Sequence, residues 1–303
     1  MKKSWKEWVL AVLLAWVVPW VASGIFMPDG VSEGPVETTA VLEPLEISVL
    51  REGCLVSMEL EEYLVGVLLG ELPEGFSQEA KMAQAVVART YALAVVERGI
   101  KHPGAVCTDS GCCQNWVSPE GYPSAKGLAS AKEAVEATAG QVLVYDGKFI
   151  EATYFSGSGG RTEAAVAVWG TDVPYLQSVE SPGEEGTAHY REETVFSAGA
   201  FLEKLGLSGP LTLGAVTYTE GGGVNSILIC GKRFLGTQVR QILGLRSTAF
   251  QITHTGNQVR IETAGYGHRV GMSQYGANAM AEAGKGWKEI LEHYYPGTEI
   301  VDR

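Results

Sequence analysis

The sequence predicts an α+β fold with mixed helices and largely antiparallel sheet, preceded by a single N-terminal transmembrane helix. Three observations lead to this prediction. The run from Trp8 to Met27 carries no charged side chain. Residues 59–98 then show helical periodicity. Beyond Asp146-Gly147 the chain changes to short strands and short helices, without alternating strand–helix–strand units.

The N-terminal segment is predicted to be an anchor and a tether. About 20 apolar residues span the ~30 Å hydrocarbon core, and the N-terminal lysines are expected to stay cytoplasmic. Residues 1–27 are thus predicted to be a cytoplasmic stub and anchor, and residues 28–45, rich in Pro, Gly, Glu and Thr, a tether. Residues 46–303 would be the extracytoplasmic domain. A cleaved signal peptide is the alternative, although the apolar run is longer than a usual signal core.

Local signals place the elements of residues 46–303. An extended segment is expected at 46–58, followed by helices at 59–71, 77–99 and 124–139, which end before Pro73, Gly99 and Gly140. Asp146-Gly147 suits a two-residue hairpin turn, because that turn requires positive φ angles. Later strands are expected at 215–219, 226–230, 250–254 and 258–263, and short helices at 197–205, 235–243, 273–283 and 286–294.

Composition excludes one class of function. The 303 residues include 23 Lys and Arg against 35 Asp and Glu, which gives a formal net charge of −12. A nucleic-acid binder would show a basic footprint, so no nucleic-acid partner is expected. The chain is long enough to bury a sizeable core, so it needs neither disulfides nor metal merely to fold.

Glu71 is the leading candidate for chemistry. On a helical wheel Leu60, Leu64 and Val67 cluster in a narrow arc, and Glu71 falls in its middle. A carboxylate on a buried stripe is costly to ionise, so its pKa should rise, which suits a general acid near neutral pH. The alternative is a glutamate at a frayed helix end that simply reaches water.

A cluster of cysteines predicts a metal site. Cys107, Cys112 and Cys113 lie within seven residues, close to His102. Thiolate and imidazole donors crowded in an irregular loop suit a tetrahedral zinc ion, and a site with all four donors bound would be structural rather than catalytic. A disulfide among the three cysteines is the alternative in an oxidising compartment.

A glycine-lined turn at 265–271 predicts a ligand-binding segment. It presents His268, and Ser273, Gln274 and Tyr275 open the next helix. Polar side chains beside bare backbone suit hydrogen bonding to a hydroxyl-rich ligand. The glycine spacing does not match a dinucleotide fingerprint. A tight structural turn with a core histidine is the alternative.

A second glycine-rich loop, SGSGG at residues 156–160, is expected to be pliant. Ser156 and Ser158 lie in it, but the nucleophile elbow of a serine hydrolase is missing, so chemistry by serine is not expected. Ser156 is therefore a candidate for substrate binding only. Trp169 and Tyr175, further along, are candidates either for glycan contact or for the core.

These segments together resemble the stage II sporulation protein D family of peptidoglycan lytic transglycosylases and amidase enhancers. The resemblance rests on residues 63–93, 156–182 and 265–300. It implies that Glu71, in a Glu-Leu-Pro matching the usual Glu-Met-Pro, is the catalytic acid/base. It also implies that Arg89, Thr90 and Tyr91 help to line or support the cleft. Similar members bind zinc through a His/Cys loop, which supports His102, Cys107 and Cys113, with Cys112 in place of a usual histidine.

Two positions depart from the family pattern. Met82 stands where a lysine is common, with Lys81 one place earlier. Arg269 replaces the middle glycine of the usual Gly-His-Gly-Val-Gly. If that position needs a positive φ, Arg269 is strained or the turn differs locally.

The resemblance implies a mechanism with one carboxylate, whereas ordinary glycosidases use two. Glu71 would protonate the glycosidic oxygen between N-acetylmuramic acid and N-acetylglucosamine, and would then accept the C6 hydroxyl proton as a 1,6-anhydro ring closes. No cofactor would act on the bond. A non-catalytic amidase enhancer is the alternative, and a hydrolysing muramidase is a third possibility.

The resemblance also implies a biological setting. The substrate would be glycan strands stripped of stem peptides, cut as the septal wall is remodelled during engulfment of the forespore. Partners would be an amidase and the membrane proteins of an engulfment complex. The protein would sit in the mother-cell membrane as a single-pass protein and face the septal wall.

Overall fold

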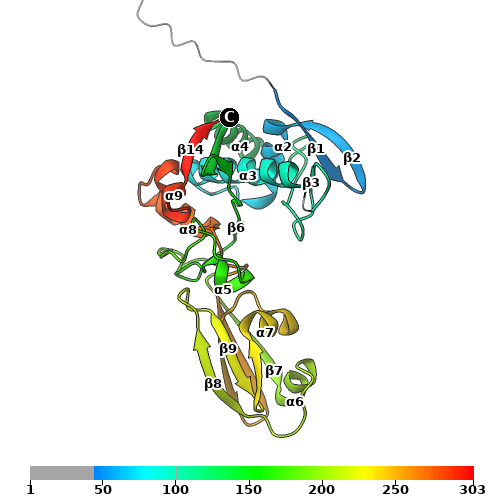
Figure 1. The fold of residues 1–303 in the computed structure, drawn as a ribbon, viewed down its shortest axis with the longest axis vertical. Helices are drawn as coiled ribbons and strands as arrows, with labels where there is room; N and C mark the ends of the chain where they lie inside the picture. The colour runs from blue at the N-terminus through cyan, green and yellow to red at the C-terminus, as the bar shows by residue number, and fades with distance from the viewer. Residues whose placement is uncertain (1–43, 100) are drawn as a thin grey trace, which may run out of the picture. The chain divides into compact units, whose positions relative to one another are not determined.

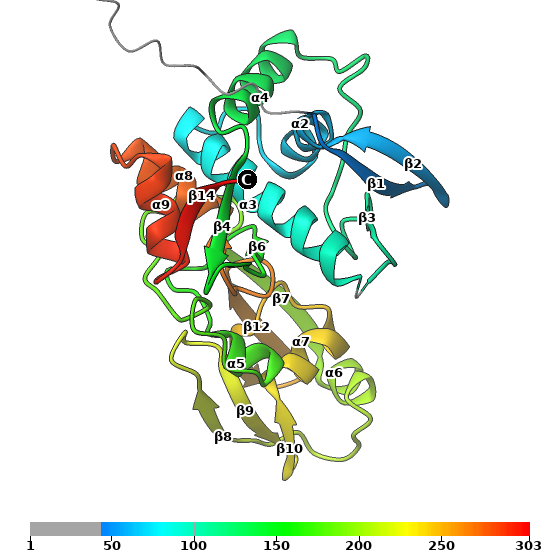
Figure 2. The same cartoon turned by 45° about the horizontal axis from the view of Figure 1, so that its top comes forward.

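The computed structural model describes residues 44–99 and 101–303, in which helices and mainly antiparallel strands are mixed (Figures 1 and 2). Its helices are α2 (Leu60–Glu71), α3 (Gln78–Arg98), α4 (Ala125–Ala137), α5 (Ala165–Trp169), α6 (Ala198–Lys204), α7 (Gly236–Leu243), α8 (Gln274–Glu282) and α9 (Trp287–Tyr294). Its strands are β1 (Glu46–Arg51), β2 (Cys54–Glu59), β3 (Ala105–Cys107), β4 (Gln141–Tyr145), β5 (Lys148–Phe149), β6 (Tyr154–Phe155), β7 (Arg191–Ser197), β8 (Leu213–Tyr218), β9 (Val224–Ile229), β10 (Lys232–Leu235), β11 (Ala249–Thr255), β12 (Gln258–Ala264), β13 (Met272–Ser273) and β14 (Glu299–Asp302).

The fold class predicted from the sequence needs one correction, which concerns the transmembrane helix. Among the described residues, no helix is long and apolar enough to cross a membrane. Even α3, which has 21 residues, carries several charged side chains. Residues 8–27, on which the prediction rested, lie outside the described part of the chain. The single-pass anchor, and the mother-cell membrane location that depended on it, are therefore not supported.

Helix α2 places Glu71 at its C-terminal end. Glu59 caps the helix, because its carboxylate accepts the N–H groups of Glu61 and Glu62. At the other end Leu72 is extended, with φ −112° and ψ 142°, as expected of a residue that precedes proline. The helix thus ends at Glu71, as the sequence predicts.

Helix α3 is buried along most of its length and separates two hydrophobic cores. Ala85, Ala88 and Ala92 face the core shared with α2 and α4. Val86 and Val87 face the core shared with α9. A helix that is apolar on several sides is an interior helix rather than a surface one. Its central position is visible in Figure 2.

Residues 191–264 form a third core of their own. Two three-stranded antiparallel sheets, ordered β11-β12-β7 and β10-β9-β8, gather with α6 and α7 around it (Figure 1). The strands predicted at 215–219, 226–230, 250–254 and 258–263 correspond to β8, β9, β11 and β12. Strand β7 was not predicted. It pairs with β12 from Arg191 to Ser197.

The predicted hairpin is present, and the strand that follows it, β6, joins the two glycine-rich segments by pairing with β13. Asp146 and Gly147 have φ angles of 50° and 70°, as the two-residue turn between β4 and β5 requires. The chain then leaves this sheet, and β6 pairs in parallel with β13. A Cβ atom at Gly271 would lie 2.0 Å from the Thr153 carbonyl oxygen, so this approach requires glycine.

The loop at residues 156–160 is more ordered than expected from its composition. Ser158 is fully buried, and its N–H and hydroxyl each donate to the Glu184 carboxylate at 2.7 Å. The Ser181 and Ser273 hydroxyls donate to the same carboxylate, each at 2.8 Å. One buried acid therefore ties the loop to the start of α8, a contact that local composition cannot reveal.

Arg269 has the positive φ that its position implied, at 67°. Its buried guanidinium donates to the carbonyl oxygens of Ser158, Arg161 and Gly221, each at 2.7 Å. It also pairs with the buried carboxylate of Glu163 at 3.3 Å. These contacts offset the backbone strain, typically about 1–3 kcal/mol for a non-glycine residue.

Candidate active site

A cleft of about 630 Å³ opens beside Glu71. Glu71 comes from the end of α2, Tyr91 from α3, Tyr154 from β6, and Gln274 from the start of α8. His268 comes from the glycine-lined turn. Segments far apart in the sequence thus converge on one carboxylate, which is the arrangement expected of an active site.

Three donors hold the Glu71 carboxylate in place. The Asn115 N–H donates to Oε1 at 2.7 Å, and the Tyr154 hydroxyl donates to the same oxygen at 3.1 Å. The Gln274 side-chain amide donates to Oε2 at 3.4 Å. Burial raises the pKa of Glu71 above its ordinary value, and the three hydrogen bonds only partly counteract that rise. Glu71 is therefore a carboxyl group held in a fixed position, whose proton is retained to higher pH than in a solvent-exposed glutamate.

A buried amide fixes the tyrosine that contacts Glu71. The Gln114 side-chain amide donates to the Tyr154 hydroxyl at 3.2 Å, and its carbonyl oxygen accepts from Tyr63 at 3.2 Å. Because Tyr154 accepts from Gln114, its own proton is free to point at Glu71. Burial keeps the pKa of Tyr154 well above 10, so it stays a donor.

His268 faces the cleft as a neutral side chain. Its Nδ1 accepts the N–H of Val270 at 3.1 Å, so its proton resides on Nε2. Burial, followed by the charge of Arg240, lowers its pKa to about 4. The ring packs against Phe155 and Trp169, with centroids 5.6 and 5.5 Å away. His268 can therefore donate a hydrogen bond to a sugar without carrying charge at neutral pH.

Four of the seven predicted substrate-binding residues line the cleft. They are Tyr91, Ser156, His268 and Gln274. Gln274 contacts the catalytic candidate itself, whereas the sequence predicted only a sugar contact.

The other three predicted substrate-binding residues do not line the cleft, and their part in substrate binding stays a prediction. Arg89 is fully buried and forms an ion pair with Glu61 at 2.5 Å, so it supports α2 from within the core. Ser273 is buried, caps α8 by accepting the Gly276 N–H, and donates to the carboxylate of Glu184. Tyr275 packs against the rings of Phe76 and His189, with centroids 5.0 and 5.1 Å away.

The four predicted metal donors come together beside the cleft. One ligand atom each from His102, Cys107, Cys112 and Cys113 lies within 4.8 Å of the others. Cys112 Sγ is 3.4 Å from His102 Nε2 and 3.9 Å from Cys113 Sγ. In a tetrahedral site with zinc–sulfur bonds of about 2.3 Å, sulfurs lie about 3.8 Å apart. The cluster could therefore hold a metal ion.

The same loop delivers a donor to Glu71. Cys113 is followed directly by Gln114 and Asn115, which hold Tyr154 and Glu71. Sequence reasoning missed both residues and also missed Tyr154. The one available signal was their place immediately after the cysteine cluster, in a segment with no periodicity of its own.

Comparison with known proteins identifies the family. A family model described as "Stage II sporulation protein" (SpoIID) matches residues 52–145. The chain is 39% identical over 280 residues to Stage II sporulation protein D of Bacillus amyloliquefaciens, covering 88% of this chain and 81% of that protein. The chain belongs to the SpoIID family of sporulation proteins.

Two further relatives support and extend this SpoIID assignment. Stage II sporulation protein D of Bacillus subtilis (strain 168) is 38% identical over 278 residues, covering 87% of this chain and 81% of that protein. The amidase enhancer of the same organism is 29% identical over 296 residues, covering 78% of this chain and 40% of the enhancer. The family predicted from the sequence is thus confirmed.

Neither Lys81 nor Met82, the two residues at or beside the position where a lysine is common in the family, lines the cleft. Lys81 Nζ donates to the Glu74 carbonyl oxygen at 2.8 Å and to Ser130 Oγ at 2.9 Å. It lines a separate small hollow with residues of α2 and α4. Met82 packs against the hydrophobic core.

Proposed function

We propose that the protein cuts the glycan strands of peptidoglycan as a lytic transglycosylase. The observation that carries the proposal is one half-buried carboxyl group, Glu71, with a raised pKa and three fixed donors. Among the residues that the structure describes, the other carboxylate lining the cleft is that of Glu151, which is exposed and pairs with Arg98 at 3.8 Å. A mechanism that needs a single acid/base suits this arrangement better than one that needs two carboxylates.

In the proposed reaction Glu71 first donates its proton to the oxygen that links N-acetylmuramic acid to N-acetylglucosamine. The bond from that oxygen to C1 breaks, and the leaving sugar takes the proton as its hydroxyl. Glu71, now a carboxylate held by Asn115 and Tyr154, accepts the proton of the C6 hydroxyl. The C6 oxygen bonds to C1 and closes the 1,6-anhydro ring, so no water is consumed.

The cleft offers the contacts that sugars need. Trp169 and Tyr266 line it and remain 44% and 43% exposed, so their rings are available to stack on pyranose faces. His268, Gln274 and Ser156 supply polar groups beside them. We propose strands freed of stem peptides as the substrate, septal wall remodelling during engulfment as the setting, and an amidase and other engulfment proteins as partners.

Product analysis tests this proposal. The full chain is incubated with denuded glycan strands, and the products are weighed by mass spectrometry. Anhydro-terminated fragments support the transglycosylase, and fragments heavier by one water would instead indicate a muramidase. No cleavage, together with activation of an amidase, would indicate an enhancer, a function favoured by the 29% identity to the Bacillus subtilis amidase enhancer.

The pH dependence of the cleavage rate should reflect the pKa of Glu71. Because the reaction needs the protonated acid, the rate should fall as pH rises through the Glu71 pKa, which burial raises above 4.5. Tyr154→Phe removes a hydrogen bond that lowers this pKa, so the falling limb should move to higher pH. The maximal rate should drop by roughly tenfold, because the carboxylate loses a donor. An unshifted limb in pH–rate profiles would exclude Glu71 as its source.

We also propose that His102, Cys107, Cys112 and Cys113 hold a structural zinc ion. Elemental analysis of the purified full chain should find about one zinc per chain, as expected of one four-donor site. Cys113→Ser should lower this content, whereas Cys230→Ser should not, because Cys230 lies outside the cluster. A disulfide would instead leave three free thiols of the five after denaturation, and that count would overturn the proposal.

A further inference from the structure

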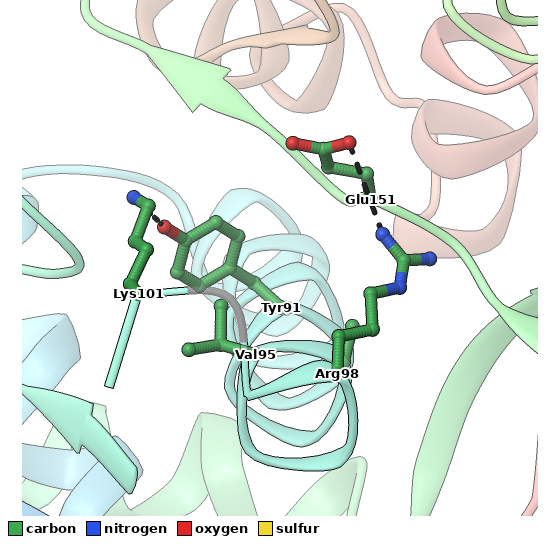
Figure 3. Close-up of a pocket in the computed structure, with 6 residues that line it drawn as sticks. Tyr91, Val95, Arg98, Lys101 and Glu151 are labelled. Atoms are coloured by element: carbon green, nitrogen blue, oxygen red, sulfur yellow. Dashed lines mark hydrogen bonds and ion pairs between the residues drawn. The ribbon is translucent and has the colours of Figure 1, made fainter. Parts of the chain in front are cut away.

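A small side pocket opens off the cleft beside Lys101. Tyr91, Lys101 and Glu151 line both spaces, and Ala94, Val95 and Arg98 complete the side pocket, which is drawn in Figure 3. Its free volume is about 50 Å³, room for roughly four water-sized groups. This is enough room for a small branched substituent of a sugar.

Lys101 gives this corner of the cleft its positive charge. Within the described part of the chain, it is the one lysine or arginine that lines the cleft. The nearby guanidinium of Arg98 is already engaged, because it pairs with Glu151 (Figure 3). It also donates to the Phe149 carbonyl oxygen at 2.8 Å. The side pocket therefore suits an anionic group that approaches Lys101.

Two hydrogen-bond donors remain unused at this point. The Lys101 ammonium has three N–H groups and donates to the Tyr91 hydroxyl at 2.7 Å and to the Cys112 carbonyl oxygen, so one is left. Tyr91 accepts from Lys101, and its own O–H has no acceptor among the described residues. Two neighbouring donors, one of them charged, are arranged to bind the two oxygens of one carboxylate.

We propose that Lys101 and Tyr91 bind the free carboxylate of the lactyl group of N-acetylmuramic acid and so select strands whose stem peptides have been removed. The inference rests on the proposed function, because it takes peptidoglycan glycan as the ligand of the cleft. When a stem peptide is present, the lactyl carboxyl is an amide. It then carries no charge for Lys101 to pair with.

The test measures binding without cleavage, in the full chain carrying Glu71→Gln. Ligands are denuded glycan strands and chito-oligosaccharides of equal length, which lack the lactyl group. Lys101→Gln should weaken binding of denuded strands by roughly tenfold, the usual effect of losing a hydrogen bond to a charged group, and should leave chito-oligosaccharide binding within about twofold. Tyr91→Phe, which leaves the Lys101–Cys112 contact in place, should weaken denuded strands selectively by a smaller factor.

Lys132→Gln is the matched control, because Lys132 is an exposed lysine on α4 outside both spaces and should change neither affinity. Equal weakening of both ligands by Lys101→Gln would mean that Lys101 merely supports the loop, and would overturn the inference. Unchanged binding of denuded strands would overturn it as well. If the protein carrying only Glu71→Gln bound neither ligand, the proposed glycan-cleaving function itself would be contradicted. If Lys101→Gln selectively weakened binding of denuded strands but the wild-type protein did not cleave them, the result would support this inference and not the proposed cleavage.

Discussion

Replacing Glu71 by glutamine is expected to reduce glycan cleavage by roughly 10²- to 10⁴-fold, the usual contribution of a general acid–base group. Glutamine keeps the shape of the side chain and can still accept the Asn115 N–H and the Tyr154 hydroxyl, but it cannot donate a proton to a leaving oxygen. The loss should therefore appear in the rate of anhydro-product formation, with glycan binding largely retained.

Glu74→Gln is the matched control for this prediction. Glu74 lies three residues further on, is exposed, and does not line the cleft. Its replacement should leave the rate within about twofold, as is usual for surface substitutions. A Glu71→Gln variant that folds and cleaves at more than a tenth of the normal rate would exclude Glu71 as the acid.

Replacing Arg269 by methionine is expected to lower the free energy of unfolding by about 3–5 kcal/mol, as for other buried ion pairs that lose one partner. Arg269 and Glu163 are 2% and 1% exposed, so the variant leaves the Glu163 carboxylate buried without its cation. The Ser158, Arg161 and Gly221 carbonyl oxygens lose a donor as well. Denaturant unfolding of the full chain measures the change.

Two further variants test whether the effect of Arg269→Met comes from the buried ion pair with Glu163. Arg260 pairs with Glu193 on the surface, where both side chains are nearly half exposed, so Arg260→Met should cost less than about 1 kcal/mol. Adding Glu163→Gln to Arg269→Met removes the unpaired charge and should recover part of the lost stability. If Arg269→Met costs no more than Arg260→Met, the buried pair does not stabilise the fold.

Most of the local structure was predictable because its signals are short-range. The Asp146-Gly147 turn, the end of α2 before Pro73, and the end of α3 at Gly99, with φ of 60°, follow from backbone sterics of a few residues. The composition of a loop proved a poor guide to its order. Ser158 lies in a glycine-rich stretch yet is held by Glu184, 26 residues away in sequence.

The residues of the candidate site also fall into those that short-range sequence signals identify and those that they do not. Glu71 was found because helical periodicity alone places it on a buried stripe, and the His/Cys cluster because its members are close in sequence. Arg89 was expected to line or support the cleft, and the structure places its guanidinium in the core, where it pairs with Glu61. No pattern within α3 distinguishes that outcome from a cleft-facing arginine.

The main helices, the hairpin turn, the family, one candidate acid and four candidate metal donors could all be identified from the amino-acid sequence. The surroundings of that acid became known from the three-dimensional fold. Asn115, Tyr154 and Gln274 are separated from Glu71 by 44, 83 and 203 residues. Their convergence depends on how α3 packs between two cores and how β6 pairs with β13. Periodicity and turn chemistry act over a few residues, whereas such contacts arise from the packing of whole elements.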